Sequence, residues 1–270
     1  MRDHIVRRRL LRPTDRIAVA VSGGKDSVSL LHVLTKIERA FPKAGLLAVS
    51  IDEGIKDYRA EALEIATENT GNLGVEHHVL TFRDLYGRDL DQIAEAASAK
   101  GESSVCAFCG ILRRKALNVA AKSHGATVLV TGHNLDDEAQ SFLMSLLRGD
   151  ISHVGRSHGR VEGFIRRAKP FSTIPEREVA LYAYLKEIRH QSVLCPYAGS
   201  SIRNDVRRFL DAIEAKHPGM KFNVRGAVDK LSPLVLRMDG TYRTCAICGE
   251  SSSGELCRSC QVLQGLGILA

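Results

Sequence analysis

Short apolar runs alternate with longer amphipathic stretches over the first part of the chain. Buried strands are predicted where apolar runs are bounded by glycine and polar residues, at residues 17–21, 46–51, 75–80 and 128–130. Between them, apolar positions recur with helical spacing from Val28 to Leu34, and residues 57–72 also read as a helix. Strands that are apolar on both faces and alternate with helices predict an α/β fold, a parallel sheet with helices on both faces.

The chain length fits one substantial core with a small appendage. At 270 residues the chain reaches the size near which single cores stop growing, roughly 250 to 300 residues. We expect a main α/β domain over residues 1–200, a basic helical extension over 201–240 and a compact cysteine-bearing segment over 241–270. No internal repeat or low-complexity tract interrupts this order.

Charge and the absence of membrane signals narrow the class of protein. The net charge is +7, and basic residues cluster at Arg7, Arg8, Arg9, Arg12, Arg113, Arg114, Lys115, Arg203, Arg207 and Arg208. Such clusters favour a polyanionic partner, although solvated helix faces would give the same pattern. No long apolar run or secretory signal is present, so we expect a cytoplasmic protein without a membrane span.

The first strand runs into a glycine-rich turn and a helix. Glycines let the backbone approach a phosphate, and the helix start adds partial positive charge. The turn adds hydroxyls and a cation in the sequence Ser22, Gly23, Gly24, Lys25, Asp26 and Ser27. The spacing differs from the ordinary NTPase loop, which argues against transfer of the γ-phosphate. It matches instead the SGGxDS signature of ATP pyrophosphatases, which cleave ATP between the α and β phosphates.

A second polar loop follows the fourth strand, at residues 132–138. Parallel strands place the loops at their carboxyl ends on one edge of the sheet, so this loop is expected to face the phosphate loop. Its carboxylates are Asp136, Asp137 and Glu138. They can cap the following helix, or hold Mg²⁺ and assist proton transfer.

Seven cysteines in a reducing compartment indicate ligands or reactive thiols rather than disulfides. Two C-x-x-C turns close to each other predict a structural Zn²⁺ site at Cys245, Cys248, Cys257 and Cys260. Three cysteines remain, Cys106, Cys109 and Cys195. Three thiolates around a [4Fe-4S] cluster leave one iron open to a ligand such as sulfide. A persulfide relay without iron is the alternative.

Six motifs together resemble a known family. They are SGGKDS at Ser22, CAFCG at Cys106, TGHNLDDEAQ at Thr131, LLRGD at Leu146, CPYAG at Cys195 and the terminal four-cysteine segment. The chain resembles the tRNA 2-thiouridine synthetases of the TtuA group, within the PP-loop ATP pyrophosphatases. These are similar to the TtcA tRNA 2-thiocytidine synthetases, which lack the four-cysteine tail.

The resemblance implies a role for each matching residue. The phosphates of ATP would be bound by Ser22, Gly23, Gly24, Lys25, Asp26 and Ser27, and the nucleotide bordered by Ala20, Asp52 and Gly132. The cluster would be held by Cys106, Cys109 and Cys195, with Cys106 and Cys195 also counted among the catalytic residues. Asp137 would be a catalytic carboxylate. Residues 1–200 would then be the PP-loop catalytic domain, which is related to the adenine nucleotide alpha hydrolases.

Two features of the chain depart from the family pattern, one residue and one module. Arg113 stands where some relatives have a lysine, and arginine is too basic to accept a proton, which leaves its role open. Relatives also carry an N-terminal zinc module, whereas the residues ahead of the phosphate loop contain no cysteine. The chain is either a natural short form or lacks its start, so the tRNA contacts of that module are not carried over to it.

The resemblance implies a two-stage reaction, in which ATP adenylates a uridine C2 carbonyl and sulfur then displaces AMP. ATP, Mg²⁺, the [4Fe-4S] cluster and Zn²⁺ would be the cofactors. The partners would be tRNA and a sulfur donor, either a thiocarboxylated ubiquitin-like carrier or sulfide, and the enzyme would be a homodimer. The alternatives are a 2-thiocytidine synthetase, a PP-loop ATP pyrophosphatase without sulfur transfer, and a non-catalytic tRNA-binding zinc protein.

Overall fold

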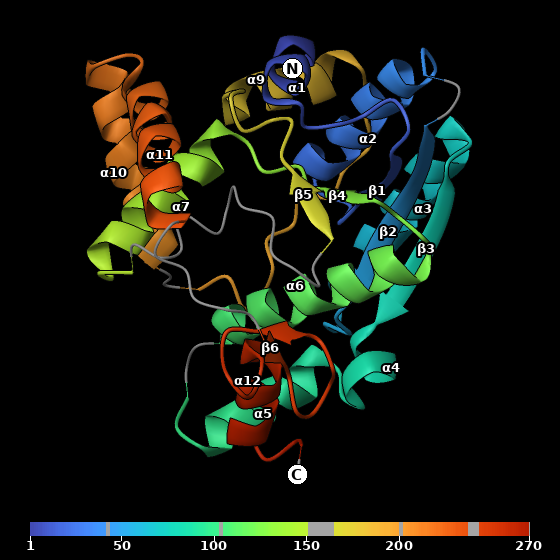
Figure 1. Cartoon of the computed structure of the whole chain (residues 1–270), viewed down its shortest axis with the longest axis vertical. Coiled ribbons are helices and arrows are strands. Elements are labelled where there is room, and N and C mark those ends of the chain that lie inside the picture. Colours follow the sequence, from blue (N-terminus) through green and yellow to red (C-terminus); the bar gives the residue numbers. More distant parts are fainter. Residues whose placement is uncertain (42–43, 103–104, 151–164, 200–201, 237–242, 270) are drawn as a thin grey trace.

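A five-stranded parallel sheet forms the centre of the molecule (Figure 1). The computed structural model describes residues 1–41, 44–102, 105–150, 165–199, 202–236 and 243–269. In sheet order the strands are β3 (Glu76–Thr81), β2 (Gly45–Asp52), β1 (Arg16–Ala20), β4 (Val128–Val130) and β5 (Arg166–Ala168). Every pair of neighbours is parallel, which confirms the predicted fold class. The sequence did not reveal β5, because it is short and two of its residues are arginines.

Helices cover both faces of this sheet. Their bounds are α1 (Arg2–Arg8), α2 (Lys25–Glu38), α3 (Arg59–Leu73), α4 (Phe82–Tyr86), α5 (Leu90–Ala99), α6 (Val105–Ser123), α7 (Leu135–Leu147), α9 (Glu176–Leu185), α10 (Ile202–Lys216), α11 (Met220–Leu236) and α12 (Arg258–Gly265). Apolar residues of α1, α2, α3 and α9 pack on one face of the sheet. Those of α4, α5, α6 and α12 pack on the other. No described helix is long and apolar enough to span a bilayer.

The order in which strands are added to the sheet reverses at β1. From β1 the chain runs outward through β2 and β3, then returns to place β4 and β5 on the opposite side of β1. The loops that leave β1 and β4 therefore part from each other at the carboxyl edge of the sheet. Ligands of open α/β sheets bind at this switch point.

Helices α10 and α11 lie side by side against α7, away from the sheet (Figure 1). A small apolar contact joins them, in which Val206 and Leu210 of α10 pack with Ala139 of α7. The predicted division of the chain at residues 200 and 240 stays a prediction, because residues 200–201 and 237–242 lie outside the described part of the chain.

The C-terminal segment packs against α6 rather than standing apart. It contains the short antiparallel strands β6 (Arg243–Thr244) and β7 (Ser251–Ser252), followed by α12. Val262 and Leu263 of α12, and Leu266 directly after it, are buried in the core formed by α5, α6 and the sheet. This segment therefore shares the main core of the protein.

Candidate active site

The loop between β1 and α2 requires glycine. Gly23 has a φ of +89°, and a Cβ atom there would lie 2.4 Å from the carbonyl oxygen of Ala62. Any larger residue would be strained and would collide with the backbone of α3. Gly24 is the N-cap of α2 and offers no capping side chain. The loop therefore presents backbone and a helix N-terminus at the edge of the sheet, as phosphate-binding loops do.

Two serines hold the ends of this loop together. The buried Ser27 hydroxyl accepts a hydrogen bond from the Ser22 amide at 3.1 Å and donates one to the Gly24 carbonyl at 2.9 Å. The two serine hydroxyls lie 3.1 Å apart. Ser27 thus shapes the loop from beneath, while Ser22 is exposed at its mouth.

The loop after β4 approaches the phosphate loop closely, as the sequence predicted. A Cβ atom on Gly132 would lie 2.9 Å from the carbonyl carbon of Asp26 and 3.1 Å from the Ser27 amide. Only glycine fits this contact without displacing backbone. Asn134 adds a hydrogen bond of 3.4 Å from its side-chain amide to the Asp26 carboxylate.

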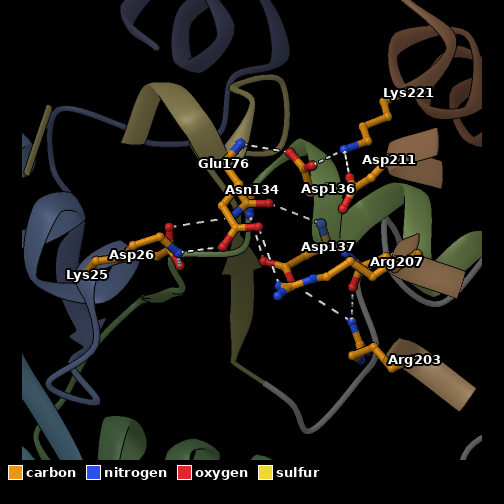
Figure 2. A network of polar contacts seen from close by, with 11 residues as sticks. Lys25, Asp26, Asn134, Asp136, Asp137, Glu176, Arg203, Arg207, Asp211 and Lys221 are labelled. Atoms are coloured by element: carbon orange, nitrogen blue, oxygen red, sulfur yellow. Dashed lines mark hydrogen bonds and ion pairs between the residues drawn. The ribbon is translucent and has the colours of Figure 1, made fainter. Parts of the chain in front are cut away.

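Lys25 lies in a network that reaches from the phosphate loop to α10 (Figure 2). Its ammonium is 2.6 Å from one oxygen of Glu176 and 3.0 Å from Asp26. Burial opposes its charge, but the bonds to Glu176 and Asp26 prevail and raise the pKa of Lys25. The other oxygen of Glu176 lies 3.4 Å from Arg207. Glu176 was missed by sequence reasoning because it lies 151 residues from Lys25.

Two of the three carboxylates at the start of α7 hold neighbouring elements together through hydrogen bonds and ion pairs. Asp136 accepts the Glu176 backbone amide at 2.7 Å and pairs with Lys221 of α11, so it joins three helices (Figure 2). Glu138 is buried and pairs with Lys169 at 2.6 Å. Burial alone would raise the pKa of Glu138, but Lys169 lowers it.

Asp137 is different because Asp26 of the phosphate loop is one of its electrostatic neighbours. It forms a capping box with Asn134, in which each side chain accepts a hydrogen bond from the other residue's amide. Burial raises the pKa of Asp137 and the nearby Asp26 adds to this, whereas Asn134 and Arg203 work in the opposite direction. Asp137 therefore caps the helix and also places a carboxylate near Asp26. Helix capping, one of the two readings left open by the sequence, is confirmed for this residue, whereas a role in holding Mg²⁺ or in proton transfer stays a prediction.

Two of the residues predicted to border the nucleotide lie at the ends of strands. Ala20 ends β1 and Asp52 ends β2, and both are partly exposed. One oxygen of Asp52 accepts the Gly54 amide at 2.8 Å, which turns the chain after β2. Both residues share the carboxyl edge of the sheet with the phosphate loop.

Two of the three core cysteines share a pocket with the phosphate loop. Cys109 of α6 and Cys195 line a pocket of about 150 Å³ together with Ser22 and Gly24. Cys106 is not part of this lining, and its thiol donates a hydrogen bond to the carbonyl of Tyr197, two residues beyond Cys195. The fold therefore brings the two distant cysteine motifs together beside the loop.

Burial keeps two of these thiols protonated in the absence of a metal. It raises the pKa of Cys109 to about 12, which the nearby Arg113 only partly offsets. Burial and Cys195 raise the pKa of Cys106. A bound metal deprotonates coordinating thiols outright, so such cysteines suit ligation better than free nucleophilic attack.

A buried carboxylate in the same pocket was not singled out from the sequence. Glu53 is 3% exposed and lies between Arg59 at 2.9 Å and Arg113 at 3.4 Å. All three side chains line the pocket with Cys109 and Cys195. The only sequence signal was its place directly after Asp52 at the end of a predicted strand.

The four terminal cysteines form a compact separate group. The ligand atoms of Cys245, Cys248, Cys257 and Cys260 all lie within 4.8 Å of one another. Four thiolates on one Zn²⁺ ion stand about 3.8 Å apart, given a Zn–S bond of about 2.3 Å. Lys115 of α6 reaches Cys260 at 3.9 Å. The donor set and its spacing therefore fit a tetrahedral zinc ion.

Comparison with known proteins settles the family. The PP-loop domain model matches residues 3–211. The tRNA 2-thiolation protein NcsA of Haloferax volcanii is 34% identical over 263 residues, which cover 92% of this chain and 81% of that protein. The chain belongs to the PP-loop tRNA 2-thiolation family. A cytoplasmic tRNA 2-thiolation protein 1 from Chlamydomonas reinhardtii is 37% identical over 270 residues, 97% of this chain and 74% of that protein.

A solved member of the PP-loop tRNA 2-thiolation family shares the whole architecture. It is the U34-tRNA thiolase NcsA from Methanococcus maripaludis with its [4Fe-4S] cluster, 32% identical with a TM-score of 0.84. The match covers 100% of this chain and 89% of the other. The predicted PP-loop fold is confirmed. The names of the relatives support the NcsA and cytoplasmic 2-thiolation branch rather than the TtuA group in particular.

The core cysteines fit the iron-sulfur cluster that this relative contains. All three are free thiols. Cys109 and Cys195 line one pocket, and Cys106 is hydrogen-bonded to the segment that carries Cys195. Each cysteine of a cluster binds a different iron, so its sulfurs stand farther apart than those sharing a zinc ion. Among the described residues, only the terminal cysteines meet the closer spacing of a single ion.

Proposed function

We propose that this chain uses ATP to convert a uridine of tRNA into 2-thiouridine. The observation that carries the proposal is that Ser22 and Gly24 of the phosphate loop line the same pocket as Cys109 and Cys195. A PP-loop ligase without sulfur transfer needs the loop but not the cysteines, and a non-catalytic tRNA-binding protein needs neither. Relatives named tRNA 2-thiolation proteins support the same activity.

In the first stage the C2 carbonyl oxygen of the uridine attacks the α-phosphate of ATP. A bond forms between that oxygen and phosphorus, the bond to the β-phosphate breaks, and pyrophosphate leaves. The amides of residues 23–27 and the Lys25 ammonium would hold the phosphates and balance their charge. Asp137 and Asp26 would hold Mg²⁺ against the phosphates, since carboxylate oxygens are its preferred ligands.

In the second stage sulfur attacks C2, the bond between C2 and the adenylated oxygen breaks, and AMP leaves with that oxygen. With hydrosulfide as donor, one proton is released and no oxidant or reductant is needed. Cys106, Cys109 and Cys195 would hold the [4Fe-4S] cluster, whose iron without a protein ligand supplies a binding place for the sulfur. Arg113 would favour the anionic donor in the pocket, because its charge is retained at neutral pH.

The target base is proposed from the branch of the family. The relative described as a U34-tRNA thiolase matches the full length of this chain, so the wobble uridine of the anticodon is our proposal. The basic helix α10 and the arginines of α1 would bind the tRNA backbone. Sulfide or a thiocarboxylated ubiquitin-like carrier would supply the sulfur, in the cytoplasm. A homodimer stays a prediction.

Thiolation in vitro tests the proposal. Anaerobically reconstituted protein, ATP, sulfide and unmodified tRNA should yield 2-thiouridine at the anticodon by mass spectrometry of nuclease fragments. Lys25→Ala should slow thiolation by about a hundredfold, since one preorganised charge contact contributes about 10²-fold or more. Lys36→Ala, an exposed lysine on the same helix, is the matched control. Equal rates in both variants, or 2-thiocytidine as product, would refute the assignment.

A further inference from the structure

One buried carboxylate joins the two halves of the pocket. Glu53 follows β2 and is 3% exposed. One of its oxygens lies 2.9 Å from Nε of Arg59, and the other lies 3.4 Å from Nη1 of Arg113. A carboxylate shared between two guanidinium groups leaves one net positive charge in the pocket wall.

Arg59 connects Glu53 to the phosphate loop. It is 5% exposed at the start of α3, and its Nη1 donates a hydrogen bond of 2.8 Å to the carbonyl of Ser22. Ser22 is the first residue of the loop. The same α3 also sets the backbone that excludes any Cβ at Gly23. The position of Arg59 therefore fixes how the loop enters its phosphate-binding turn.

Arg113 connects Glu53 to the cysteines. It lies one helical turn after Cys109 on α6, so the two side chains share a face of the helix. Both line the pocket with Cys195. Arg113 is 49% exposed in its side chain, and the bond to Glu53 limits where its guanidinium points.

We propose that Glu53 is a positioning residue that couples the phosphate loop to the cysteine pocket. It fixes the Ser22 carbonyl through Arg59 and the charge beside Cys109 through Arg113. A change at either end alters how the carboxylate is shared, and coupling between two sites acts equally in both directions. The identity of the two ligands, ATP and the sulfur-bearing cluster, rests on the function proposed above.

A purely structural role for Glu53 gives a different expectation. Breaking a buried ion pair destabilises a protein wherever it lies. Asp15→Asn is therefore a matched control, because Asp15 is equally buried and pairs with Arg166 at the opposite end of β1. If Glu53 only supported the fold, Glu53→Gln and Asp15→Asn would lower stability alike and leave the pocket unaltered.

A double-mutant cycle on ATP binding separates these possibilities. The affinity of the cluster-free protein for α,β-methylene-ATP is measured by calorimetry for wild type, Glu53→Gln, Arg113→Ala and the double variant. We expect Glu53→Gln to weaken binding about tenfold and Arg113→Ala about threefold, with Arg113→Ala adding nothing in the Glu53→Gln background. Asp15→Asn should bind as wild type does. Equal effects of Arg113→Ala in both backgrounds would indicate through-space charge and overturn the proposal.

Two further measurements keep the test decisive. Arg114→Ala removes the same charge from the next residue of α6. If Glu53→Gln does not fold, Arg113→Ala must still weaken binding more than Arg114→Ala, and equal weakening refutes the proposal. In reduced, reconstituted protein the analogue should shift the EPR signal in wild type but not in Glu53→Gln. Wild type that fails to bind the analogue would instead contradict the proposed function.

Discussion

The two cysteine sites of this protein share α6 but are built in different ways. Cys106, Cys109 and Arg113 occupy the first half of the helix, and Cys109 and Arg113 line the pocket beside the phosphate loop. Lys115, about 9 Å further along the axis from Cys109, reaches the terminal cysteines. The first site needs a third cysteine from 86 or more residues away, whereas the second draws all its ligands from one short segment.

From this difference we infer that the three-cysteine site serves the reaction and the four-cysteine site stabilises the structure. Two of the three core cysteines, Cys109 and Cys195, line a pocket of about 150 Å³. The four-cysteine site is closed, and Asn118 and Lys122 of α6 also hold this segment through Glu250. Metal sites with a full set of protein ligands stabilise structure, and those with an open position perform reactions. The closed site thus supports the helix that carries part of the open one.

The largest expected effect is loss of chemistry at the open site. Cys109→Ser should remove the broad visible absorption of the reconstituted protein and lower thiolation by at least about a hundredfold, because a cluster ligand is lost. Binding of ATP by the cluster-free protein should change little, since the phosphate loop makes its own contacts. The measurements are absorption spectroscopy, nucleoside mass spectrometry and calorimetry. A fully active, iron-free enzyme after anaerobic chelation would contradict a role for the cluster and support the persulfide relay.

Loss of the closed site should instead reduce stability throughout the fold. The terminal segment does not stand alone, because α12 is buried in the main core. Cys260→Ser should lower the free energy of unfolding by more than about 3 kcal/mol and expose α6 amides to hydrogen exchange. Cys106→Ser, at an exposed cysteine, is the control and should leave the stability of the cluster-free protein unchanged. Loss of protection confined to residues after 242 would contradict this expectation.

A smaller effect is expected when the packing is weakened but the metal is retained. Leu263 is 1% exposed in the core next to α6, so Leu263→Ala should cost about 2 to 4 kcal/mol of unfolding free energy through the cavity it leaves. Zinc content should remain full, because the cysteines are untouched. Chemical denaturation and metal analysis measure the two quantities. Leu234→Ala, at a leucine that is 59% exposed, should cost under about 0.5 kcal/mol.

The smallest expected effect comes from replacing either of two neighbouring carboxylates on α7, Asp137 and Glu138. We expect the first to serve the reaction and the second to stabilise the fold. The pKa of Asp137 is raised in the folded protein, so its ionised form costs stability at neutral pH. Asp137→Asn should therefore raise the free energy of unfolding at pH 7 while slowing thiolation. This gain should vanish as the pH falls below about 4, where the carboxyl of the unfolded chain is protonated.

Glu138 provides the opposite sign as a control. Lys169 lowers the pKa of Glu138, so its ionised form adds stability that is present at neutral pH and lost on acidification. Glu138→Gln should therefore destabilise the protein at pH 7. Thermal unfolding over pH 3 to 8 measures both variants, and effects of equal sign would contradict the distinction between them.

Features encoded by neighbouring residues could be predicted from the sequence. The four longer or fully apolar strands, the phosphate loop and the four-cysteine group each depend on local pattern and spacing. The strand β5 could not be predicted, because its arginines give no apolar signal. Glu176 and Glu53 were also missed, since an acidic residue becomes part of a site only through partners that the fold brings to it.

The sequence by itself determined the parallel α/β fold, the loop at residues 22–27 and a group of four terminal cysteines with the spacing of ligands to one metal ion. Each follows from hydrophobic period, backbone freedom or ligand spacing within a few residues. Only the tertiary structure decided that Cys195 returns to α6, that Glu53 connects two arginines, and that α12 is part of the core. These contacts join segments far apart in the chain, and their energy depends on burial that no local pattern records.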